Sequence, residues 1–244
     1  MKIALIGYGK IGQLIEKLAP QANHEIVAII DPKLPSRTIS KANLKDADVC
    51  IDFSHPNAVF DNIQKLAECG KNIVVGTTGW YDQIDHVQKI VSTNSIGFLY
   101  APNFSIGVHL FLQIIKEAAQ LINAFDQYDI GGFEAHHQQK VDSPSGTAKA
   151  IAQMLLDRIE RKNSVIYGSP QKALESHELH FGSLRCGSLP GTHTITFDSP
   201  VDTITITHEA KNREGFARGA LSGAEWLQGK QGFYTIEDLL GGLV

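Results

Sequence analysis

Two adjacent histidines and a lysine lie close together near the middle of the chain, at His136, His137 and Lys140. A histidine side chain can donate a proton near neutral pH, and a lysine ammonium attracts anions. The residues that follow open a predicted helix and would offer backbone N–H groups to an anion: Ser145, Gly146 and Thr147. The segment therefore contains the parts of a proton donor and of a carboxylate-binding loop.

The histidine pair also has a structural alternative, because histidines in polar loops serve more often as surface or supporting residues than as acids. The neighbouring lysine and the Ser-Gly-Thr helix start favour catalysis by His136 over that alternative. A zinc site at His136 and His137 is not expected, since no cysteine or carboxylate set at the usual ligand spacing accompanies them. We therefore predict no metal. Arg185 is either a further contact to the same anion or a solvated strand charge.

A second set of residues opens the chain, where the motif G-x-G-x-x-G follows a short apolar run. The first glycine permits a tight turn, the second lets the backbone approach a pyrophosphate, and the third lets helix and strand pack closely. Asp31 ends the next apolar run, nineteen positions after Gly12, where a carboxylate accepts hydrogen bonds from ribose hydroxyls. The motif predicts a dinucleotide site, with a purely structural glycine turn as the alternative. The cofactor-binding residues predicted here are Gly7, Tyr8, Gly9, Lys10, Ile11, Gly12 and Asp31.

Asp31 also bears on the choice between the two nicotinamide dinucleotides. Its carboxylate repels the extra phosphate of NADP, which favours NADH, whereas Lys33 and, less strongly, Arg37 can offset that repulsion. For each of these two cations a solvated loop charge is an equal alternative. We predict NADH, NADPH or both as the cofactor, with a preference for NADH, and we include Lys33 among the cofactor-binding residues.

Two further short segments follow predicted parallel strands, at the edge of the sheet where ligands of open α/β folds bind. The segment G-T-T-G follows the fourth strand, and A-P-N-F follows the fifth. We predict that they hold the nicotinamide and its ribose, although loop structure alone explains the two threonines equally well. The residues predicted here are Gly76, Thr77, Thr78, Ala101, Pro102, Asn103 and Phe104.

The elements that must position these residues follow from the apolar pattern. Five short apolar runs separated by helical patterns occupy the N-terminal part of the chain: KIALI, EIVAII, DVCIDF, NIVVG and IGFLY. Continuous hydrophobic runs of this length are typical of parallel strands covered on both faces. The polar stretch from Asp31 to Asp46, which contains two prolines, is the exception and is predicted as a surface loop. This part of the chain is expected to form one doubly wound domain.

The rest of the chain has a different pattern. A long helix is predicted from Ser105 to Phe125, followed by the strand YDIGGFEA before the histidine loop. A second helix is predicted to begin with Ser143 as N-cap and Pro144 as its first residue. The runs HELHF, THTITF and DTITITHEA alternate in polarity, which predicts a mixed or antiparallel sheet with a hairpin at DSPV. The tail from Glu214 returns to helical periodicity and is expected to pack on the first domain.

Composition and charge restrict the kind of partner. The chain has 244 residues, 43% hydrophobic and 20% charged, as in ordinary globular proteins. Its formal net charge is -4 and no segment is dominated by lysine and arginine, so neither nucleic acid nor a membrane surface is an expected partner. The three cysteines form no C-x-x-C pair, and the opening apolar run is too short for a signal peptide or a membrane span. We expect a reduced, cytoplasmic protein with a small-molecule ligand.

The segment E-x-H-H-x-x-K-x-D-x-P-S-G-T-A closely resembles the signature of the dihydrodipicolinate reductase family. The resemblance extends along the chain through the glycine motif, D-F-S-H-P, G-T-T-G-W, A-P-N-F-S-I-G-V, and the later R-C-G and G-T-H. It implies a nicotinamide-dependent oxidoreductase of bacterial lysine and diaminopimelate synthesis. The implied substrate is a cyclic dicarboxylate, 4-hydroxy-tetrahydrodipicolinate, which receives a hydride from the nicotinamide and a proton at the neighbouring position.

The resemblance also implies roles for the central segment. His136 would be the acid that protonates the substrate, and Lys140 would assist it and bind a substrate carboxylate. The substrate-binding set would be His137, Lys140, Ser145, Gly146 and Thr147. These roles come from the resemblance, and the residue spacing permits them.

The expected fold is α/β, with a Rossmann-type doubly wound parallel sheet and a second, mixed α+β domain. Residues 1–105, completed by 214–244, are predicted to bind the dinucleotide. Residues 106–213 are predicted to bind the substrate and, as the resemblance implies, to assemble a homotetramer. Two rival functions remain: another two-domain dehydrogenase of a semialdehyde or a sugar, and a non-catalytic sensor of dinucleotides.

Overall fold

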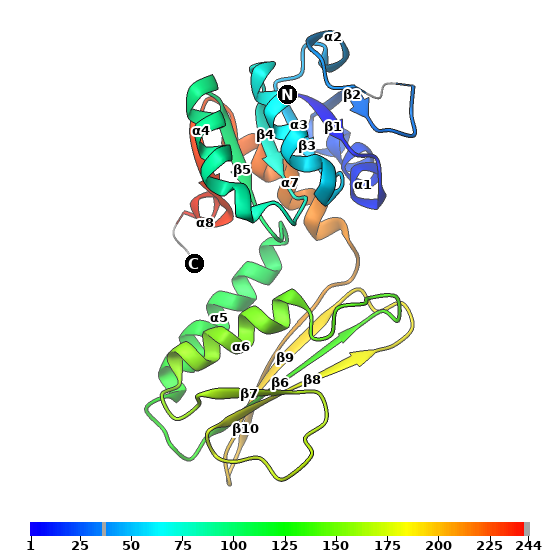
Figure 1. The fold of residues 1–244 in the computed structure, drawn as a ribbon. Helices are drawn as coiled ribbons and strands as arrows, with labels where there is room; N and C mark the ends of the chain where they lie inside the picture. Colours follow the sequence, from blue (N-terminus) through cyan, green and yellow to red (C-terminus); the bar gives the residue numbers. More distant parts are fainter. Residues whose placement is uncertain (36–37, 242–244) are drawn as a thin grey trace. The chain divides into compact units, whose positions relative to one another are not determined.

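The computed structural model describes residues 1–35 and 38–241, and the chain divides into two compact units. The first unit contains residues 1–106 together with 213–244, and the second contains residues 107–212. Figure 1 shows a sheet with helices against it in each unit. The first unit is discontinuous in sequence because the C-terminal tail joins the sheet that the N-terminal part begins.

The first unit is built on a parallel sheet of six strands in the order β11-β5-β4-β3-β1-β2. Its strands are β1 (Lys2–Ile6), β2 (Glu25–Ile30), β3 (Val49–Asp52), β4 (Asn72–Val75), β5 (Gly97–Tyr100) and β11 (Gly232–Thr235). Five of them lie on the five apolar runs of the sequence, in which β-branched residues fit a pleated, buried surface. The parallel sheet confirms the predicted Rossmann-type class.

Helices cover both faces of this sheet (Figure 1). The helical segments are α1 (Lys10–Leu18), η1 (Ala19–Ala22), α2 (Lys41–Leu44), α3 (Pro56–Glu68), η2 (Tyr81–Gln83), α4 (Ile84–Asn94), α7 (Glu214–Leu227) and α8 (Ile236–Leu239). Alternate residues of β1 serve opposite cores: Ala4 and Ile6 lie in the core shared with α3 and α4, and Ile3 and Leu5 lie in the core shared with α1 and α7. This alternation follows from the two-residue period of a strand.

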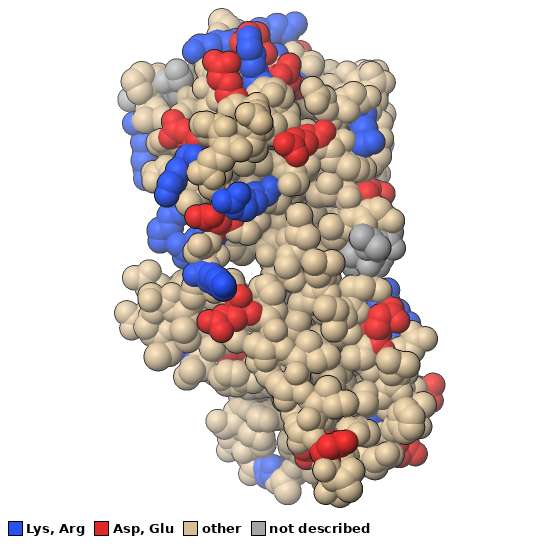
Figure 2. Space-filling view, turned by 180° about the vertical axis from the view of Figure 1, so that it is seen from behind, with Lys and Arg blue, Asp and Glu red and all other residues tan. Residues whose placement is uncertain are grey.

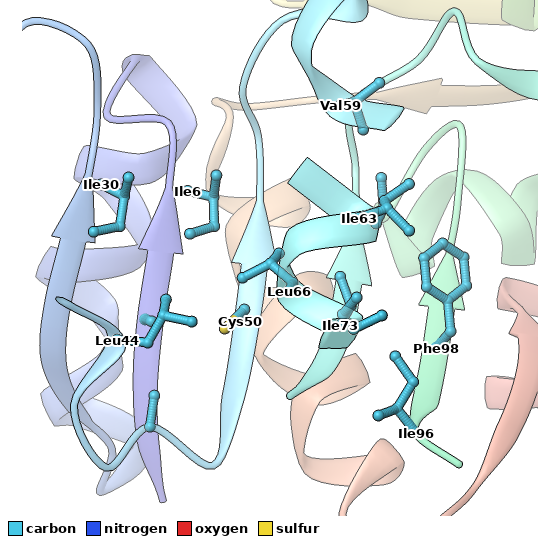
Figure 3. Packing of buried hydrophobic residues seen from close by; sticks show 14 of the residues in the cluster. Ile6, Ile30, Leu44, Cys50, Val59, Ile63, Leu66, Ile73, Ile96 and Phe98 are labelled. Atoms are coloured by element: carbon cyan, nitrogen blue, oxygen red, sulfur yellow. The ribbon is translucent and has the colours of Figure 1, made fainter. Parts of the chain in front are cut away.

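Figure 3 shows the core beneath α3. Val59, Ile63 and Leu66 recur at the three- and four-residue intervals that place side chains on one face of a helix. They pack over Ile73 of β4 and Cys50 of β3, and all five side chains are at most 1% exposed. The helix is thereby fixed over the middle strands, which end at the loops of the predicted cofactor site.

The second unit contains a mixed five-stranded sheet in the order β10-β9-β6-β8-β7. Its strands are β6 (Asp129–His136), β7 (Ser164–Tyr167), β8 (Glu178–Arg185), β9 (Thr192–Asp198) and β10 (Thr203–Glu209). Strand β6 is parallel to β8 and antiparallel to β9, and β9 and β10 form the predicted hairpin. Helices α5 (Ile106–Ile122) and α6 (Gly146–Arg158) supply apolar side chains to a single core with one face of this sheet.

Several predicted elements need correction. Helix α6 begins at Gly146 with Ser145 as N-cap, instead of at Pro144 with Ser143 as N-cap, because the Ser145 hydroxyl accepts the Ala148 N–H at 3.1 Å. The tail is not helical throughout, since β11 extends the first sheet beside β5. The loop after Asp31 contains α2, a single turn whose Leu44 is fully buried. Strand β7 was not predicted.

None of the helices in residues 1–35 and 38–241 is long and apolar enough to cross a membrane.

Candidate active site

The glycine turn between β1 and α1 has the geometry that the motif requires. Gly7 has φ +88°, a conformation that favours glycine, and a Cβ there would lie 2.5 Å from the Phe53 carbonyl oxygen. A Cβ on Gly12 would lie 2.5 Å from the Gly7 oxygen, so this glycine lets the helix approach the turn. A Cβ on Gly9 would meet nothing within 4 Å among the described residues. The second glycine therefore leaves open space, where a pyrophosphate can approach the backbone at the start of α1.

Asp31 lies at the end of β2, where its carboxylate accepts the Tyr8 N–H at 2.8 Å and the Lys33 N–H at 2.9 Å. These contacts hold the acid against the glycine turn. Asp31, Lys33, Gly7, Tyr8 and Gly9 line one cavity of about 500 Å³. Arg37 lies outside the described residues.

A second cavity, of about 540 Å³, gathers most of the other predicted cofactor residues. They come from the turn, from the end of β4 and from the end of β5: Gly9, Lys10, Ile11, Gly76, Thr77, Thr78, Ala101, Pro102, Asn103 and Phe104. Gly9, Phe53 and Ser54 line both cavities, so the two are neighbours along the carboxyl ends of the strands. Gly12 lines neither, in keeping with its packing role. Phe53 and Ser54 belong to D-F-S-H-P and were not among the predicted site residues.

The side chains of Thr77 and Phe104 have structural roles as well. The Thr77 hydroxyl donates to the Asp52 carboxylate at 2.6 Å and accepts the Ser54 N–H at 2.8 Å, while Phe104 is 1% exposed within a core cluster. Burial raises the pKa of the Asp52 carboxyl, and hydrogen bonds from Thr77, Ser54 and Asn62 oppose that shift. The buried aspartate thus ties the loop after β3 to the loop after β4.

The second cluster of chemical interest lies in the sheet of the second unit. The strand register places Glu134 of β6 opposite Ser183 of β8 and His193 of β9, and places His136 opposite Arg185. Glu134 is fully buried, and its Oε2 lies 3.3 Å from His136 Nδ1 and 3.6 Å from His193 Nε2. The two imidazole rings meet edge to face with centroids 5.2 Å apart. The predicted acid therefore stands beside a buried carboxylate and a second histidine.

The part of the segment that is predicted to bind an anion connects this cluster to α6. Lys140 Nζ pairs with the Asp142 carboxylate at 2.9 Å, and its side chain is 24% exposed. The Ser145 N–H donates to Glu134 Oε1 at 2.9 Å and its hydroxyl caps α6, so Ser145 is committed to structure. Gly146 is exposed and has nothing within 4 Å of a Cβ position, and Thr147 is half-buried. The first turn of α6 is thus open to a ligand at Gly146.

Two sequence-based arguments change at this cluster. No cysteine or carboxylate set at the usual ligand spacing was found beside His136 and His137 in the sequence, but the fold brings Glu134, His136 and His193 together, with one potential metal ligand from each within 4.8 Å of the others. The absence of a metal remains a prediction. Arg185 is not a solvated strand charge, since its Nη2 lies 2.9 Å from Glu134 Oε1 and it also donates to the carbonyls of Lys140 and Asp142.

Glu134 and His193 were missed as site residues. The signal for Glu134 was present, because a glutamate two positions before a histidine on a strand shares its face. His193 offered only the motif G-T-H, since the register that brings β9 beside β6 is a tertiary feature.

Comparison with known proteins gives the family. Residues 1–104 match the model described as dihydrodipicolinate reductase, N-terminus, and residues 107–240 match the model described as dihydrodipicolinate reductase, C-terminus. The chain belongs to the dihydrodipicolinate reductase family. The resemblance stated from the sequence motifs is thereby confirmed.

Individual members of the dihydrodipicolinate reductase family match along their whole length. The 4-hydroxy-tetrahydrodipicolinate reductase of Christiangramia forsetii is 39% identical over 243 residues, covering 100% of this chain and 99% of the relative. That of Staphylococcus aureus is 36% identical, covering 98% and 100%. A dipicolinate-bound dihydrodipicolinate reductase structure from Paenisporosarcina sp. TG-14 matches with a TM-score of 0.74 and 25% identity over 98% of each chain. The family's enzymes are NAD(P)H-dependent oxidoreductases, so the chain is an enzyme of this class.

Proposed function

We propose that the chain reduces 4-hydroxy-tetrahydrodipicolinate, the cyclic dicarboxylate that its relatives are named for, with a reduced nicotinamide dinucleotide. One observation carries the proposal: the segment from Glu134 to Ala148 combines a histidine held by a buried carboxylate, a lysine at the surface and an open helix start. Those are the parts needed to donate a proton to a dianion and to hold it. This step belongs to the synthesis of lysine and diaminopimelate, as implied for the family.

The second unit would bind the substrate. The backbone N–H groups at the start of α6, at Gly146 and Thr147, can donate to one carboxylate, assisted by the positive end of the helix dipole. Lys140 would exchange its partner Asp142 for a substrate carboxylate, because an exposed ion pair is held by only about 1 kcal/mol or less. His137 is half-buried in the same loop and would complete this set. The dipicolinate bound to the Paenisporosarcina relative is also a cyclic dicarboxylate.

The residues of the first unit fit a nicotinamide dinucleotide. The open space at Gly9 and the positive φ of Gly7 would let a pyrophosphate approach the backbone. The Asp31 carboxylate lies where ribose hydroxyls would donate hydrogen bonds to it. The loops after β4 and β5 would surround the nicotinamide end, in the second cavity. When bound, the reduced dinucleotide supplies the hydride. His136 supplies the proton, so that one hydride and one proton together reduce one double bond of the dehydrated substrate.

A preference for NADH over NADPH is part of the proposal. The Asp31 carboxylate lines the first cavity and repels a further phosphate on the adenosine ribose. Lys33 and Lys65 line the same cavity and supply positive charge, which allows NADPH to bind as well. We therefore expect NADH to bind more tightly than NADPH, without NADPH being excluded.

The chain's assembly and surroundings also remain proposals. The outer face of the second sheet carries Phe133 and Leu184, which are 43% and 45% exposed, beside threonine pairs such as Thr194 and Thr207. A second copy of the chain would cover this face in the implied homotetramer. On the face in Figure 2, basic and acidic side chains are interspersed. A cytoplasmic location without nucleic-acid or membrane partners is still predicted.

The test is an assay in which the unstable substrate is made in place from aspartate semialdehyde and pyruvate by the preceding synthase. We expect consumption of NADH, and more slowly of NADPH, only when all components are present. Oxidation of the dinucleotide by a semialdehyde or a sugar alone would favour the rival dehydrogenase. Tight dinucleotide binding without turnover on any of these compounds would favour the sensor.

A further inference from the structure

Glu134 and His136 are two residues apart on β6, so both side chains lie on the same face of the second sheet. That face is the one covered by α5 and α6, and Glu134 is 0% exposed there while His136 is 8% exposed. A carboxylate is seldom buried completely unless its oxygens are paired. The partners of its two oxygens therefore show what the carboxylate does.

The first oxygen, Oε1, is surrounded by three donors. The Ser145 N–H lies 2.9 Å away, the Ser183 hydroxyl 3.0 Å away and the Arg185 Nη2 2.9 Å away. A carboxylate oxygen has two lone pairs, so three donors saturate it. These three hydrogen bonds fix the position of Oε1 and, with it, the orientation of the carboxylate.

The second oxygen, Oε2, faces the two histidines. Among the described residues it lies 3.3 Å from His136 Nδ1 and 3.6 Å from His193 Nε2. Both Oε2 and His136 Nδ1 are buried from solvent, and within the described part of the chain neither has a conventional hydrogen bond to another group. A buried carboxylate oxygen without a donor is costly, and catalytic hydrogen bonds are often long before a ligand binds. The buried Oε2 is satisfied when His136 Nδ1 carries a proton, whereas His193 Nε2 lies closer to the Ser145 hydroxyl, at 3.4 Å.

We propose that Glu134, with His193 beside it, positions His136: Oε2 accepts a hydrogen bond from Nδ1–H of His136, so that Nε2 is the nitrogen that delivers the proton to substrate. The proposal rests on the proposed function of His136. Glu134 touches no reacting atom and is therefore a positioning residue. Its role resembles that of the buried acid that orients the histidine of a hydrolase triad.

The surroundings of Nε2 agree with this assignment. Gly191, in the motif G-T-H, has φ +147°, and a Cβ there would lie 3.1 Å from His136 Nε2. Every other residue type would place a side chain against this nitrogen. The glycine thus keeps one side of Nε2 open while Glu134 occupies Nδ1.

The charge state of Glu134 is also consistent with its role as the acceptor for His136. Burial alone raises the pKa of this carboxyl, but the facing imidazoles of His136 and His193 and the hydrogen bonds from Ser145 and Arg185 together hold the pKa well below its usual value. The group is therefore a carboxylate, the charge state in which Oε2 accepts a hydrogen bond from His136 Nδ1–H. A metal ion at Glu134, His136 and His193 is the competing occupant, and the Arg185 guanidinium on the same carboxylate opposes it.

The decisive variant is Glu134→Gln, which keeps the shape and removes the charge. The glutamine amide would place its NH2 group where Oε2 was, facing His136 Nδ1. Because this N–H needs an acceptor, Nδ1 would lose its proton, and the neutral His136 ring should change from the Nδ1–H to the Nε2–H tautomer. Heteronuclear NMR of the ring nitrogens reads this change directly, with the His136 signal assigned by its loss in His136→Gln. We expect kcat to fall by about a hundredfold or more, with the Kd for NADH changed by less than about threefold, as for loss of an acid's orienting partner.

Two further variants separate positioning from folding. Glu134→Asp retains the carboxylate and should keep the Nδ1–H tautomer with a kcat between those of the wild type and Glu134→Gln. Glu160→Gln, the same substitution at an exposed site of the second unit, should leave tautomer and kcat unchanged. Thermal unfolding of each variant shows whether it is folded. If Glu134→Gln does not fold, the tautomer and kcat of Glu134→Asp are compared with those of the wild type instead.

An Nε2–H tautomer in the wild-type protein, or an unchanged His136 signal in a folded Glu134→Gln, would overturn the proposal. A large increase in thermal stability on adding Zn²⁺, lost in Glu134→Gln, would overturn it in favour of the metal site. The NMR measurement needs no turnover. If the wild type fails to reduce the substrate, the proposed function fails while the arrangement of Glu134 and His136 is still tested.

Discussion

At the scale of single residues, the chemistry of the chain depends on which side chains are already committed to the fold. Thr77 and Ser145 were predicted to bind ligands, yet the Thr77 hydroxyl is held by Asp52 and the Ser145 hydroxyl caps α6. A hydrogen bond from Ser145 to substrate would have to form in addition to its capping bond. Within residues 1–35 and 38–241, His136 contacts Glu134 through Nδ1, and no hydrogen bond engages its Nε2. The residue with an uncommitted nitrogen is the one assigned to proton transfer.

The His136→Gln variant tests that assignment. We expect kcat to fall by about a hundredfold or more, because the rate loses its general acid, while dinucleotide affinity is unchanged because the glycine turn is intact. His177→Gln, at an exposed histidine of the same unit, is the matched control and should keep the wild-type rate. Steady-state kinetics with titration of NADH fluorescence measure both quantities. Near-normal turnover would remove His136 from the mechanism.

At the scale of elements, the sequence predicts what local pattern determines. The apolar runs of β1 to β5 and the long α5 were predicted because each run is longer and more regular than its surroundings. Strand β11 was missed because GFYT is too short to outweigh the helical tail around it, and only pairing with β5 makes it a strand. His193 was missed for the same reason, since its place beside Glu134 depends on the β6–β9 register.

The turn between β1 and α1 gives a prediction at this scale, because its glycines have separable roles. Gly12→Ala should lower stability by about 1–3 kcal/mol, since the new Cβ would lie 2.5 Å from the Gly7 oxygen. Gly9→Ala should cost less than about 1 kcal/mol, because nothing lies within 4 Å of its Cβ, yet it should raise the Kd for NADH by tenfold or more. Urea unfolding and NADH titration measure the two effects. Equal losses of stability in both variants would refute separate roles.

At the scale of the whole molecule, stability should depend on pH through Glu134. Its pKa in the folded chain is far below the ordinary 4.5, so below that pH the unfolded chain takes up a proton that the folded chain does not. This group's contribution is therefore complete above about pH 4.5 and is lost as pH falls, by at most about 1.4 kcal/mol per pH unit. Urea unfolding of wild type and Glu134→Gln from neutral pH to about pH 3.5 should show their stability difference shrinking. A constant difference would contradict the carboxylate assignment.

Assembly is tested at the outer face of the second sheet. If a second copy covers this face, Phe133→Glu should give a species of smaller mass, because a buried charge without a partner is strongly unfavourable in an interface. Leu121→Glu, at a 70% exposed leucine of α5, serves as the control. Light scattering coupled to gel filtration gives the masses. An unchanged mass in Phe133→Glu would place the interface elsewhere.

The most direct test follows the hydride itself. Reduced dinucleotide carrying deuterium at the reactive carbon of the nicotinamide is mixed with the enzyme and with substrate generated in place, and the product is analysed by mass spectrometry. We expect a product heavier by one deuterium, formed by the wild type and formed at least about a hundredfold more slowly by His136→Gln. A product without the label, or labelled product formed equally fast by the variant, would contradict it.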